Sequence, residues 1–308
     1  MDDLSIQTSR EIREGHLAGK ATVALESTVL TRGLPRPQNL QLAREMEAAV
    51  RQNGAVPATI AFLDGRLHVG LTDSELERLA GENDVYKVGP RDYATVMVNR
   101  ACGGTTVAGT MLACKHANLK VFATGGIGGV HRDAPFDISA DLQALATIPM
   151  IVVCAGAKAI LDLPATLEYL ETMSVPVVGY GTDEFPAFYS SESGLDVSVR
   201  LDTPQDIVDF ARAHWGTGLR SAVLVTNPVP AADAIPGTEM EPYIVQANQE
   251  AHRQNIHGKD LTPFLLQRIS ELTGGKSMRA NLSLLLNNAR LAARIAAALK
   301  LSERLKQA

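Results

Sequence analysis

One segment joins the pattern of a buried strand to a long polar connection: Val121-Phe-Ala-Thr-Gly-Gly-Ile-Gly-Gly-Val-His-Arg-Asp-Ala-Pro-Phe-Asp-Ile-Ser-Ala-Asp141. Its first residues form an apolar run that is typical of a buried strand. The connection that follows holds four glycines, a histidine, an arginine and three aspartates. A simple turn does not need so many polar side chains, so this connection predicts a functional site.

The glycines and carboxylates of this connection suit two kinds of ligand. Backbone N–H groups around Thr124, Gly125 and Gly126 can approach an anion closely, because glycine has no side chain in the way. The carboxylates further along can hold a hard cation such as Mg²⁺ or Mn²⁺. Together they predict a site for a phosphorylated ligand and a metal. The alternative is a flexible glycine turn whose charges face solvent.

Two other predicted strands also lead to a residue with useful chemistry. Residues 21–25 lead directly to Glu26, and the apolar residues 148–154 lead to Lys158. Ligands of open α/β sheets bind beyond the carboxyl ends of strands, so Glu26 is a candidate acid or base. Lys158 follows small residues that solvate it poorly, which favours a neutral amine able to form a Schiff base. Position alone leaves open a surface or capping role for Glu26 and a solvated turn for Lys158.

Three further segments each allow two interpretations. Lys87, in the strand pattern of residues 85–88, is either an edge-strand charge or a phosphate contact. A helix predicted over residues 103–114 begins with threonines and could receive an anion at its N-terminus. The acidic and aromatic residues of 181–189 either line a pocket for a planar base or fill a core.

Strand and helix patterns alternate as far as residue 226, which predicts an α/β fold with a mostly parallel sheet covered on both faces. Three helix patterns then predict a helical C-terminal layer over residues 240–308. Asparagines on the last one face solvent, a neighbour's backbone or a ligand. No linker or repeat divides the chain, so we expect one domain over 1–308, with residues 1–20 as an N-terminal arm or helix. The expected strands are 21–25, 56–62, 67–69, 85–88, 121–124, 148–154, 175–180 and 222–226, and the expected helices are 37–53, 73–80, 103–114, 164–173, 203–215, 240–256, 263–273 and 278–301.

Composition excludes several classes of function. The 308 residues carry a net charge of −5, and a nucleic-acid-binding surface would need a basic face, so we expect a small-molecule substrate. The cysteines are three in number and form no CxxC pair, which indicates reduced thiols and a cytoplasmic protein. No window reaches the roughly 18 apolar residues of a membrane span, and no signal-peptide pattern opens the chain, so we expect no membrane partner.

Six separated blocks follow one another in the chain: Ala24-Leu-Glu-Ser-Thr28, Thr105-Thr-Val-Ala108, Thr124-Gly-Gly-Ile-Gly-Gly-Val-His-Arg132, Phe136-Asp-Ile-Ser-Ala-Asp-Leu142, Cys154-Ala-Gly-Ala-Lys158 and Gly179-Tyr-Gly-Thr-Asp-Glu-Phe-Pro-Ala-Phe-Tyr189. Together they resemble the pseudouridine-5′-phosphate glycosidase family, which is similar to indigoidine synthase A. The resemblance spans about residues 20–300 and includes Asn227-Pro-Val-Pro and Ala280-Asn-Leu. Six blocks in one order are far more specific than the glycine stretch alone.

The resemblance implies an enzyme that reversibly cleaves the C–C glycosidic bond of pseudouridine 5′-phosphate to give uracil and ribose 5-phosphate. It also implies a three-layer α/β/α fold, a homotrimer and a divalent metal, typically Mn²⁺. By the family pattern, Lys158 matches the nucleophile that forms an imine with C1′ of the ring-opened sugar, Glu26 the proton donor and Asp137 the metal ligand. Substrate-binding positions of the family match Lys87, Val107, Ser139, Ala140 and Asp141.

The chemistry of these residues agrees with the implied reaction. A C–C glycosidic bond has no basic leaving atom to protonate, so the paired carboxylates of ordinary glycosidases would not suffice. A lysine amine joined to C1′ provides an electron sink, and a carboxylic acid can supply the proton. One aspartate with ordered waters suits Mg²⁺ or Mn²⁺. The glycine turn, Lys87 and His131 would hold the 5′-phosphate through charge and backbone donors.

The chain departs from the family pattern at three places. Arg32 stands where the pattern has a histidine, Gly104 where alanine is common, and the connection between Arg132 and Phe136 is shorter than usual. Arg32 matters most, since a permanent cation beside Glu26 would keep that carboxyl ionised and make it a poorer acid. The alternative function is therefore a related enzyme that forms or cleaves another C-glycoside in natural-product biosynthesis.

Two other classes of function remain as rivals. A non-catalytic phosphosugar sensor would keep the pocket without turnover, but the presence of Lys158, Glu26 and Asp137 together argues against it. A dinucleotide-dependent oxidoreductase would use residues 124–129, yet their glycine spacing is not GxGxxG and no acidic residue is placed for a ribose.

Overall fold

The computed structural model describes residues 5–132 and 134–307. At its centre lies an eleven-stranded sheet. Its strands are β1 (Ile6–Thr8), β2 (Ala21–Leu25), β3 (Ala55–Leu63), β4 (Arg66–Val69), β5 (Tyr86–Val88), β6 (Gly103–Thr105), β7 (Val121–Ala123), β10 (Ile151–Cys154), β12 (Val177–Tyr180), β13 (Val199–Leu201) and β14 (Val223–Thr226).

The sheet is mostly parallel, as the alternating pattern predicted. The main path runs β1-β4-β3-β2-β7-β10-β14-β12-β13, and β6 joins β5 to β3. The antiparallel pairs within this sheet are β3 with β4 and β3 with β6. The β3–β4 pair is the predicted hairpin, in which Asp64 and Gly65 both take positive φ values, of 51° and 74°. A separate antiparallel sheet is built from β8 (Val130–His131), β9 (Ala134–Ile138) and β11 (Leu161–Asp162).

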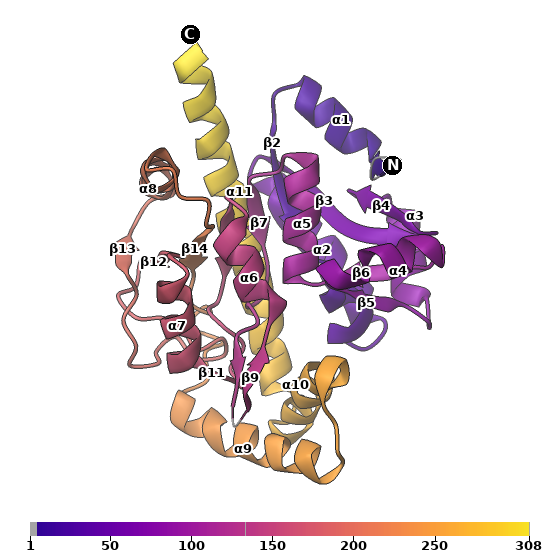
Figure 1. Cartoon of the computed structure of the whole chain (residues 1–308), viewed down its shortest axis with the longest axis vertical. Helices are drawn as coiled ribbons and strands as arrows, with labels where there is room; N and C mark the ends of the chain where they lie inside the picture. The colour runs from indigo at the N-terminus through magenta and orange to yellow at the C-terminus, as the bar shows by residue number, and fades with distance from the viewer. Residues whose placement is uncertain (1–4, 133, 308) are drawn as a thin grey trace.

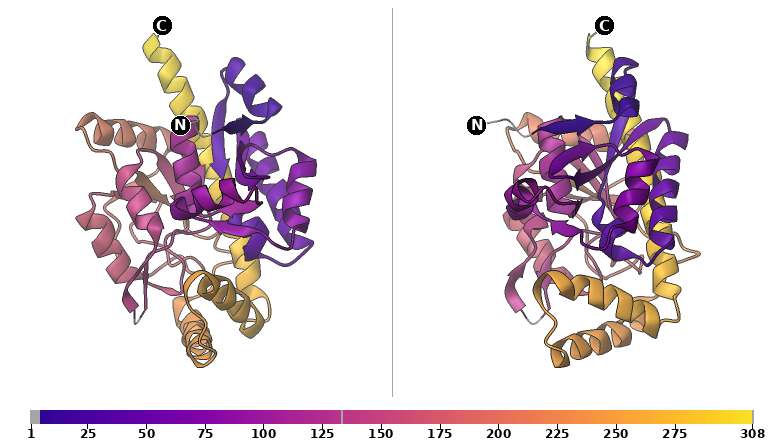
Figure 2. Two further views of the ribbon diagram at one scale, coloured as in Figure 1. Left: turned by 45° about the vertical axis from the view of Figure 1, so that its right-hand side comes forward. Right: turned by 90° about the vertical axis from the view of Figure 1, so that its right-hand side faces the viewer.

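Helices cover both faces of the central sheet, so the fold is the expected three-layer α/β/α arrangement (Figures 1 and 2). The helices are α1 (Arg10–Leu17), α2 (Gln38–Gln52), α3 (Asp73–Gly81), α4 (Tyr93–Val98), α5 (Val107–Ala117), α6 (Ala140–Thr147), α7 (Leu163–Thr172), α8 (Pro204–Gly216), α9 (Gly237–Arg253), α10 (Leu261–Leu272) and α11 (Lys276–Gln307). One face carries α5, α6 and α7, and the other carries α2, α8 and α11 (Figure 2). No described helix is long and apolar enough to cross a membrane.

The C-terminal helices form where the sequence predicted them, but they do not make one layer. The long helix α11 packs along β2, β7 and β10 and against α2 and α8, so it belongs to one face of the sandwich. In contrast, α9 and α10 pair with each other at one end of the molecule (Figure 1). The prediction of a single helical layer over residues 240–308 therefore merged two structural units.

Two predicted segments need correction. The helix expected over residues 103–114 begins only at Val107, because Gly103–Thr105 is strand β6 and Thr106 is the N-cap, its hydroxyl accepting from Gly109 N at 3.2 Å. Within residues 1–20, Ile6–Thr8 is a strand that pairs with β4, so this part of the predicted arm is docked onto the sheet.

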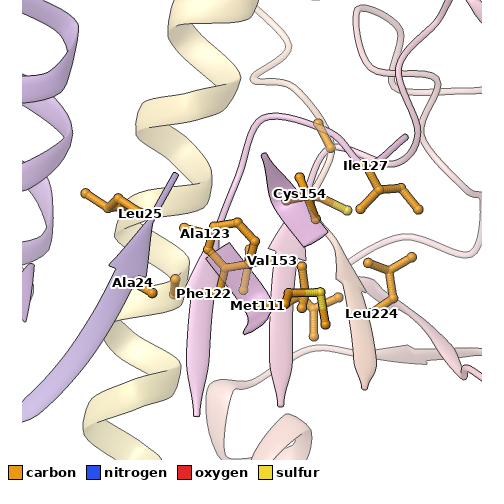
Figure 3. Packing of buried hydrophobic residues seen from close by; sticks show 14 of the residues in the cluster. Ala24, Leu25, Met111, Phe122, Ala123, Ile127, Val153, Cys154 and Leu224 are labelled. Atoms are coloured by element: carbon orange, nitrogen blue, oxygen red, sulfur yellow. The ribbon is translucent and has the colours of Figure 1, made fainter. Parts of the chain in front are cut away.

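The core lies between the central strands and their covering helices. Strands β2, β7, β10 and β14 are almost entirely buried, which explains their continuous apolar sequences. Figure 3 shows Ala24, Phe122 and Val153 on three of these strands. Phe122 is fully buried, and burial of such a side chain contributes about 1.5–3 kcal/mol. This packed centre fixes the strand ends from which the site is built.

Candidate active site

Four adjacent strands bring the predicted site residues to one edge of the sheet. β2, β7, β10 and β14 are neighbours and parallel, so their carboxyl ends lie together. Glu26 follows β2, Thr124 follows β7, Lys158 follows the loop after β10, and Asn227 follows β14. Residues far apart in the sequence therefore meet where open α/β sheets bind ligands.

A cavity of about 780 Å³ opens at this edge. Its volume lies within the range of ligand pockets, roughly 300–1,000 Å³. Thr124 is not part of its lining, but it contacts Glu26, which is. The predicted residues that line it are Glu26, Lys87, Val107, Gly125, Gly126, His131, Asp137, Ser139, Ala140, Asp141 and Lys158.

Glu26 is held in conditions that favour its protonated form. The Thr124 hydroxyl donates a hydrogen bond to its carboxyl. Burial raises the pKa of Glu26, against the opposing effects of the Lys158 charge and this hydrogen bond. A carboxyl with a raised pKa can carry a proton and give it to a reacting atom.

The expected effect of Arg32 on Glu26 is wrong. Its guanidinium Nη2 donates to Val85 O at 2.9 Å, and its Nη1 lies 3.6 Å from Asp260 Oδ1. The arginine is thus engaged by the residue before β5 and by the connection between α9 and α10. The pKa of Glu26 is raised rather than lowered, so Arg32 does not hold Glu26 ionised.

Lys158 is positioned by hydrogen bonds between the loop after β7 and the loop after β10. Its Nζ donates to Gly126 O at 2.8 Å, and its own N–H donates to Ile127 O at 3.1 Å. Ala155 N also donates to Gly125 O at 2.8 Å. A Cβ on Gly126 would come within 2.6 Å of the Phe188 ring, so the close packing of the two loops against Phe188 requires a glycine at this position. The glycine stretch therefore aims Lys158 into the cavity.

Lys87 reaches the cavity because β5 pairs with β6, next to α5. Burial and the charge of Lys158 lower the pKa of Lys87, while Asp141 raises it. Two amines and two carboxyls are thus close enough to influence one another. Lys87 is half-buried at the site and is not the exposed edge-strand charge that its sequence position allowed.

Asp141 joins two helix N-termini to the glycine stretch. Its Oδ1 accepts from Ala108 N of α5 and its Oδ2 from Gly128 N, both at 2.8 Å. Asp141 is buried, with 6% of its surface exposed. A Cβ on Gly128 would collide with Ser139 Oγ, so this packing also requires glycine. Asp141 was predicted as a substrate contact, and the structure places both of its oxygens on backbone donors.

Backbone donors in this region divide into two sets. The N–H groups of Thr124, Ile127, Gly128 and Val130 already donate to protein acceptors, so much of the glycine stretch is unavailable to an anion. The N–H groups at the first positions of α5 and α6, Val107 and Ala140, make no hydrogen bond within residues 5–132 and 134–307. Both residues line the cavity. The donors for an anion are therefore better placed at these helix starts.

His131 and Asp137 lie on the β8–β9 hairpin at the rim of the cavity. Burial lowers the pKa of His131, although the nearby Asp137 carboxylate raises it. Asp137 is exposed. Asp133, in the shortened connection, lies outside the described residues.

The hairpin can be tested against the donor set that a metal requires. Across the described residues no group of three His, Cys, Asp or Glu side chains could chelate a metal. What is present, one carboxylate beside a neutral imidazole, fits a cation that keeps most of its water.

The asparagines of α11 supply contacts that the sequence left undecided. Asn288 is fully buried, donates to Thr124 O at 2.8 Å and accepts from Asn227 Nδ2 at 3.0 Å. Asn287 donates to Pro228 O at 3.2 Å. Of the alternatives, bonding to a neighbour's backbone is the one that holds for these two. Their signal in the sequence was a polar amide inside an apolar helix.

Asn281 differs from the other two. Only 8% of its surface is exposed and it lines the cavity, yet its side chain has no hydrogen-bond partner among the described residues. Its amide atoms are not among the enclosed atoms that lack a partner, so they are open to the cavity and available to a ligand.

Comparison with known proteins places this site in a family context. The family described as indigoidine synthase A like protein matches residues 11–298. A pseudouridine-5′-phosphate glycosidase of Solibacter usitatus is 52% identical over 295 residues, covering 95% of this chain and 99% of the relative. One from Paracoccus denitrificans is 54% identical over 300 residues, covering 96% and 97% of the two chains.

Two solved structures share the whole fold. An indigoidine synthase A-like protein of Thermotoga maritima has a TM-score of 0.88 and 34% identity, covering 96% of this chain and 97% of that one. The prealnumycin C-glycosynthase AlnA, solved in complex with ribulose 5-phosphate, has a TM-score of 0.90 and 38% identity, covering 98% and 99%.

Proposed function

The chain belongs to the indigoidine synthase A-like family, and on this premise we propose that it is a pseudouridine-5′-phosphate glycosidase. The enzyme hydrolyses the bond between C1′ of the ribose and C5 of uracil, and the reaction is reversible. The observation that carries the proposal is the meeting of Glu26, with its raised pKa, and Lys158 in one cavity. Relatives at 52% and 54% identity that bear this name support it.

The 5′-phosphate binds at the starts of α5 and α6. The N–H groups of Val107 and Ala140 point from helix N-termini, which favour anions. Lys87 adds a positive charge at the same wall of the cavity. Asp141 contributes by tying the two helix starts together, so it positions the phosphate donors.

Lys158 acts on the sugar. The Lys158 amine forms a bond to C1′ while the bond from C1′ to the ring oxygen breaks, and a proton that leaves the nitrogen passes to that oxygen. The nitrogen lone pair then forms an imine as the bond from C1′ to uracil C5 breaks. Glu26 delivers the proton that C5 needs, so neutral uracil leaves. Water hydrolyses the imine, releasing ribose 5-phosphate and restoring the amine.

The uracil end of the substrate meets Asn281. Uracil presents alternating carbonyl acceptors and N–H donors, which an amide can match. Because the Asn281 amide has no partner among the described residues, binding uracil would satisfy it. A base that lacks these groups would leave it unsatisfied, so this contact selects for the base.

A divalent metal, Mn²⁺ or Mg²⁺, is part of the proposal. Asp137 would hold it, with His131 beside it, and water would fill the remaining positions. When bound, the metal would neutralise charge on the substrate phosphate. The support is the exposed carboxylate of Asp137, which lines the cavity together with His131.

A second candidate function is the formation of another C-glycoside. It is favoured by the structural likeness to the prealnumycin C-glycosynthase, at 38% identity. The higher identities to relatives that bear the glycosidase name favour cleavage of pseudouridine 5′-phosphate.

One assay tests the proposal. Purified protein with pseudouridine 5′-phosphate should release uracil, faster with Mn²⁺ than after chelation. Borohydride added with ribose 5-phosphate should trap a covalent adduct on Lys158, visible by peptide mass analysis, and the Lys158→Ala variant should trap none. No uracil release with or without Mn²⁺ would refute the glycosidase and leave the C-glycoside alternative.

Assembly and location complete the proposal. We propose a homotrimer in the cytoplasm, supported by the resemblance and by three buried cysteines that form no disulfide. Sedimentation equilibrium would test the subunit count. A monomer at micromolar concentration would contradict it.

A further inference from the structure

A second cavity of about 330 Å³ lies beside the active-site cavity. This side chamber shares part of its wall with the main cavity, so the two spaces adjoin. The residues common to both are Arg32, Gly33, Pro263, Leu266 and Asn281.

The side chamber extends from the site toward the surface. Its remaining walls come from the segment after Arg32, from Tyr189 in the loop between β12 and β13, from α10 and from the start of α11. Pro35, Gln267 and Glu271 are exposed, whereas Tyr189 and Ser277 are buried. The chamber therefore has an outer rim at solvent and an inner end at the active site. These walls are Leu34, Pro35, Tyr189, Gln267, Ser270, Glu271, Ser277 and Met278.

Two polar groups at the junction lack partners. Nε of Arg32 is buried without a hydrogen-bond partner, although the two terminal nitrogens of the same group are engaged. Asn281 is 8% exposed as a residue, and its amide, which also has no partner among the described residues, is open to the cavities that it lines. The accessible amide of Asn281, which carries both a donor and an acceptor, suits a small planar molecule with carbonyl and N–H groups.

We propose that the side chamber is the passage by which the free base reaches and leaves the active site. The inference rests on the proposed glycosidase function. While the sugar is joined to Lys158 and its phosphate lies at α5 and α6, that part of the main cavity is occupied. The neutral base therefore needs a separate route, and Asn281, which lines both cavities, offers it a hydrogen bond at the junction.

The charged side chains along the side chamber do not attract a phosphate group. At the rim, Glu271 is paired with Arg268 at 2.9 Å, and at the junction Arg32 lies 3.6 Å from Asp260. Balanced charges give no net attraction for an anion, so the passage discriminates between the two products.

The experiment blocks the chamber with bulky side chains. Ser270→Trp and Met278→Trp fill its wall from two different helices, and Gln249→Trp, on the exposed part of α9, controls for the added bulk. Each variant is assayed for synthesis of pseudouridine 5′-phosphate and for exchange of labelled uracil into it. We expect KM for uracil to rise about tenfold in both blocked variants, with KM for ribose 5-phosphate changed less than about twofold.

Three outcomes would overturn the inference. Unchanged KM for uracil in both blocked variants is the first, and an equal rise in both KM values is the second. The third is a rise in KM for uracil in Gln143→Trp, at the main cavity wall, but not in the blocked variants. Absence of uracil exchange in the wild type would instead overturn the proposed function, and this inference with it.

Discussion

The burial of Glu26 favours its protonated, catalytically useful form and at the same time lowers the stability of the folded protein at neutral pH. Burial disfavours its carboxylate more strongly than Lys158 and the Thr124 hydroxyl favour it, so its pKa is raised. In the unfolded chain the carboxyl ionises freely. Between the two pKa values the folded protein binds more protons than the unfolded one, so stability falls as pH rises through this window.

The Glu26→Gln variant separates these two effects. The amide cannot give a proton, so kcat for uracil release should fall about 10²–10⁴-fold. The wild-type rate should decline as pH rises above the raised pKa of Glu26, since the acid form is needed. The variant should gain thermal stability relative to wild type above about pH 4.5, the ordinary pKa of the group. Melting curves of both proteins across a range of pH check this. A difference in Tm between variant and wild type that stays constant with pH would contradict the protonated state assigned to Glu26.

Asp141 is the second residue whose role the geometry redefines. Asp141→Asn keeps the shape but replaces one acceptor by an NH₂ group that faces a backbone N–H. We expect the free energy of unfolding in urea to fall by about 1.5–3 kcal/mol, the value of a hydrogen bond to a charged group. KM should rise as well, because the helix starts separate. A change in KM alone would show that Asp141 only contacts substrate.

At the scale of elements, a hydrogen bond from α11 holds the start of the glycine stretch in place. Asn288 bonds to Thr124 O, and Asn227 bonds to Asn288, so one helix joins the ends of β7 and β14. The loop that positions Lys158 thus depends on a helix more than a hundred residues later in the chain. Its rigidity comes from this buried amide pair as well as from backbone bonds.

Asn288→Ala should therefore damage both stability and catalysis. Loss of the buried amide leaves Thr124 O and the Asn227 amide without their partners, which should lower the free energy of unfolding by about 2 kcal/mol. Asn287→Ala is the matched control, because that side chain is only half-buried and makes one bond, to Pro228 O. Its cost should stay below about 1 kcal/mol. Chemical denaturation measures both, and equal losses would contradict the linking role of Asn288.

The sequence predicted the elements whose patterns are local. The apolar runs of β7, β10 and β14 and the turn at Asp64 could be recognised because their signals lie within a few residues. In contrast, β8, β9 and β11 were missed. They are short, and β11 is added from a distant segment, so no local periodicity marks them.

The site could be predicted in its reactive residues but not in its supports. Glu26 and Lys158 follow strand patterns, and parallel strands carry such residues to one edge. The unbonded N–H groups of Val107 and Ala140 depend on the meeting of two helices, which Asp141 brings about. The Arg32 contacts with Val85 and Asp260 likewise join segments far apart in the chain, so no local pattern could predict them and the effect expected for Arg32 on Glu26 was wrong.

At the scale of the whole molecule, α10 closes one side of the cavity without belonging to the sandwich, and α9 packs against α10. Thr262 and Leu266 of α10 line the cavity. An ion pair ties α9 to the β8–β9 hairpin, with Arg132 Nη1 and Glu241 Oε1 2.5 Å apart. Arg132 also donates to Ala159 O at 3.2 Å, next to Lys158. The helical pair is thus connected to the wall that carries the nucleophile.

Glu241→Ala should therefore weaken substrate binding more than it weakens the fold. Both side chains are partly exposed, so the pair contributes at most about 1 kcal/mol, and KM for pseudouridine 5′-phosphate should rise up to about fivefold. Glu239→Ala is the matched control, because it removes an ion pair from α9 to Lys276 that does not touch the cavity wall. High salt should reduce the difference between wild type and Glu241→Ala, since it screens the pair. Equal KM values for the two variants would mean that α9 supports α10 at the cavity through packing alone, without the help of this charge.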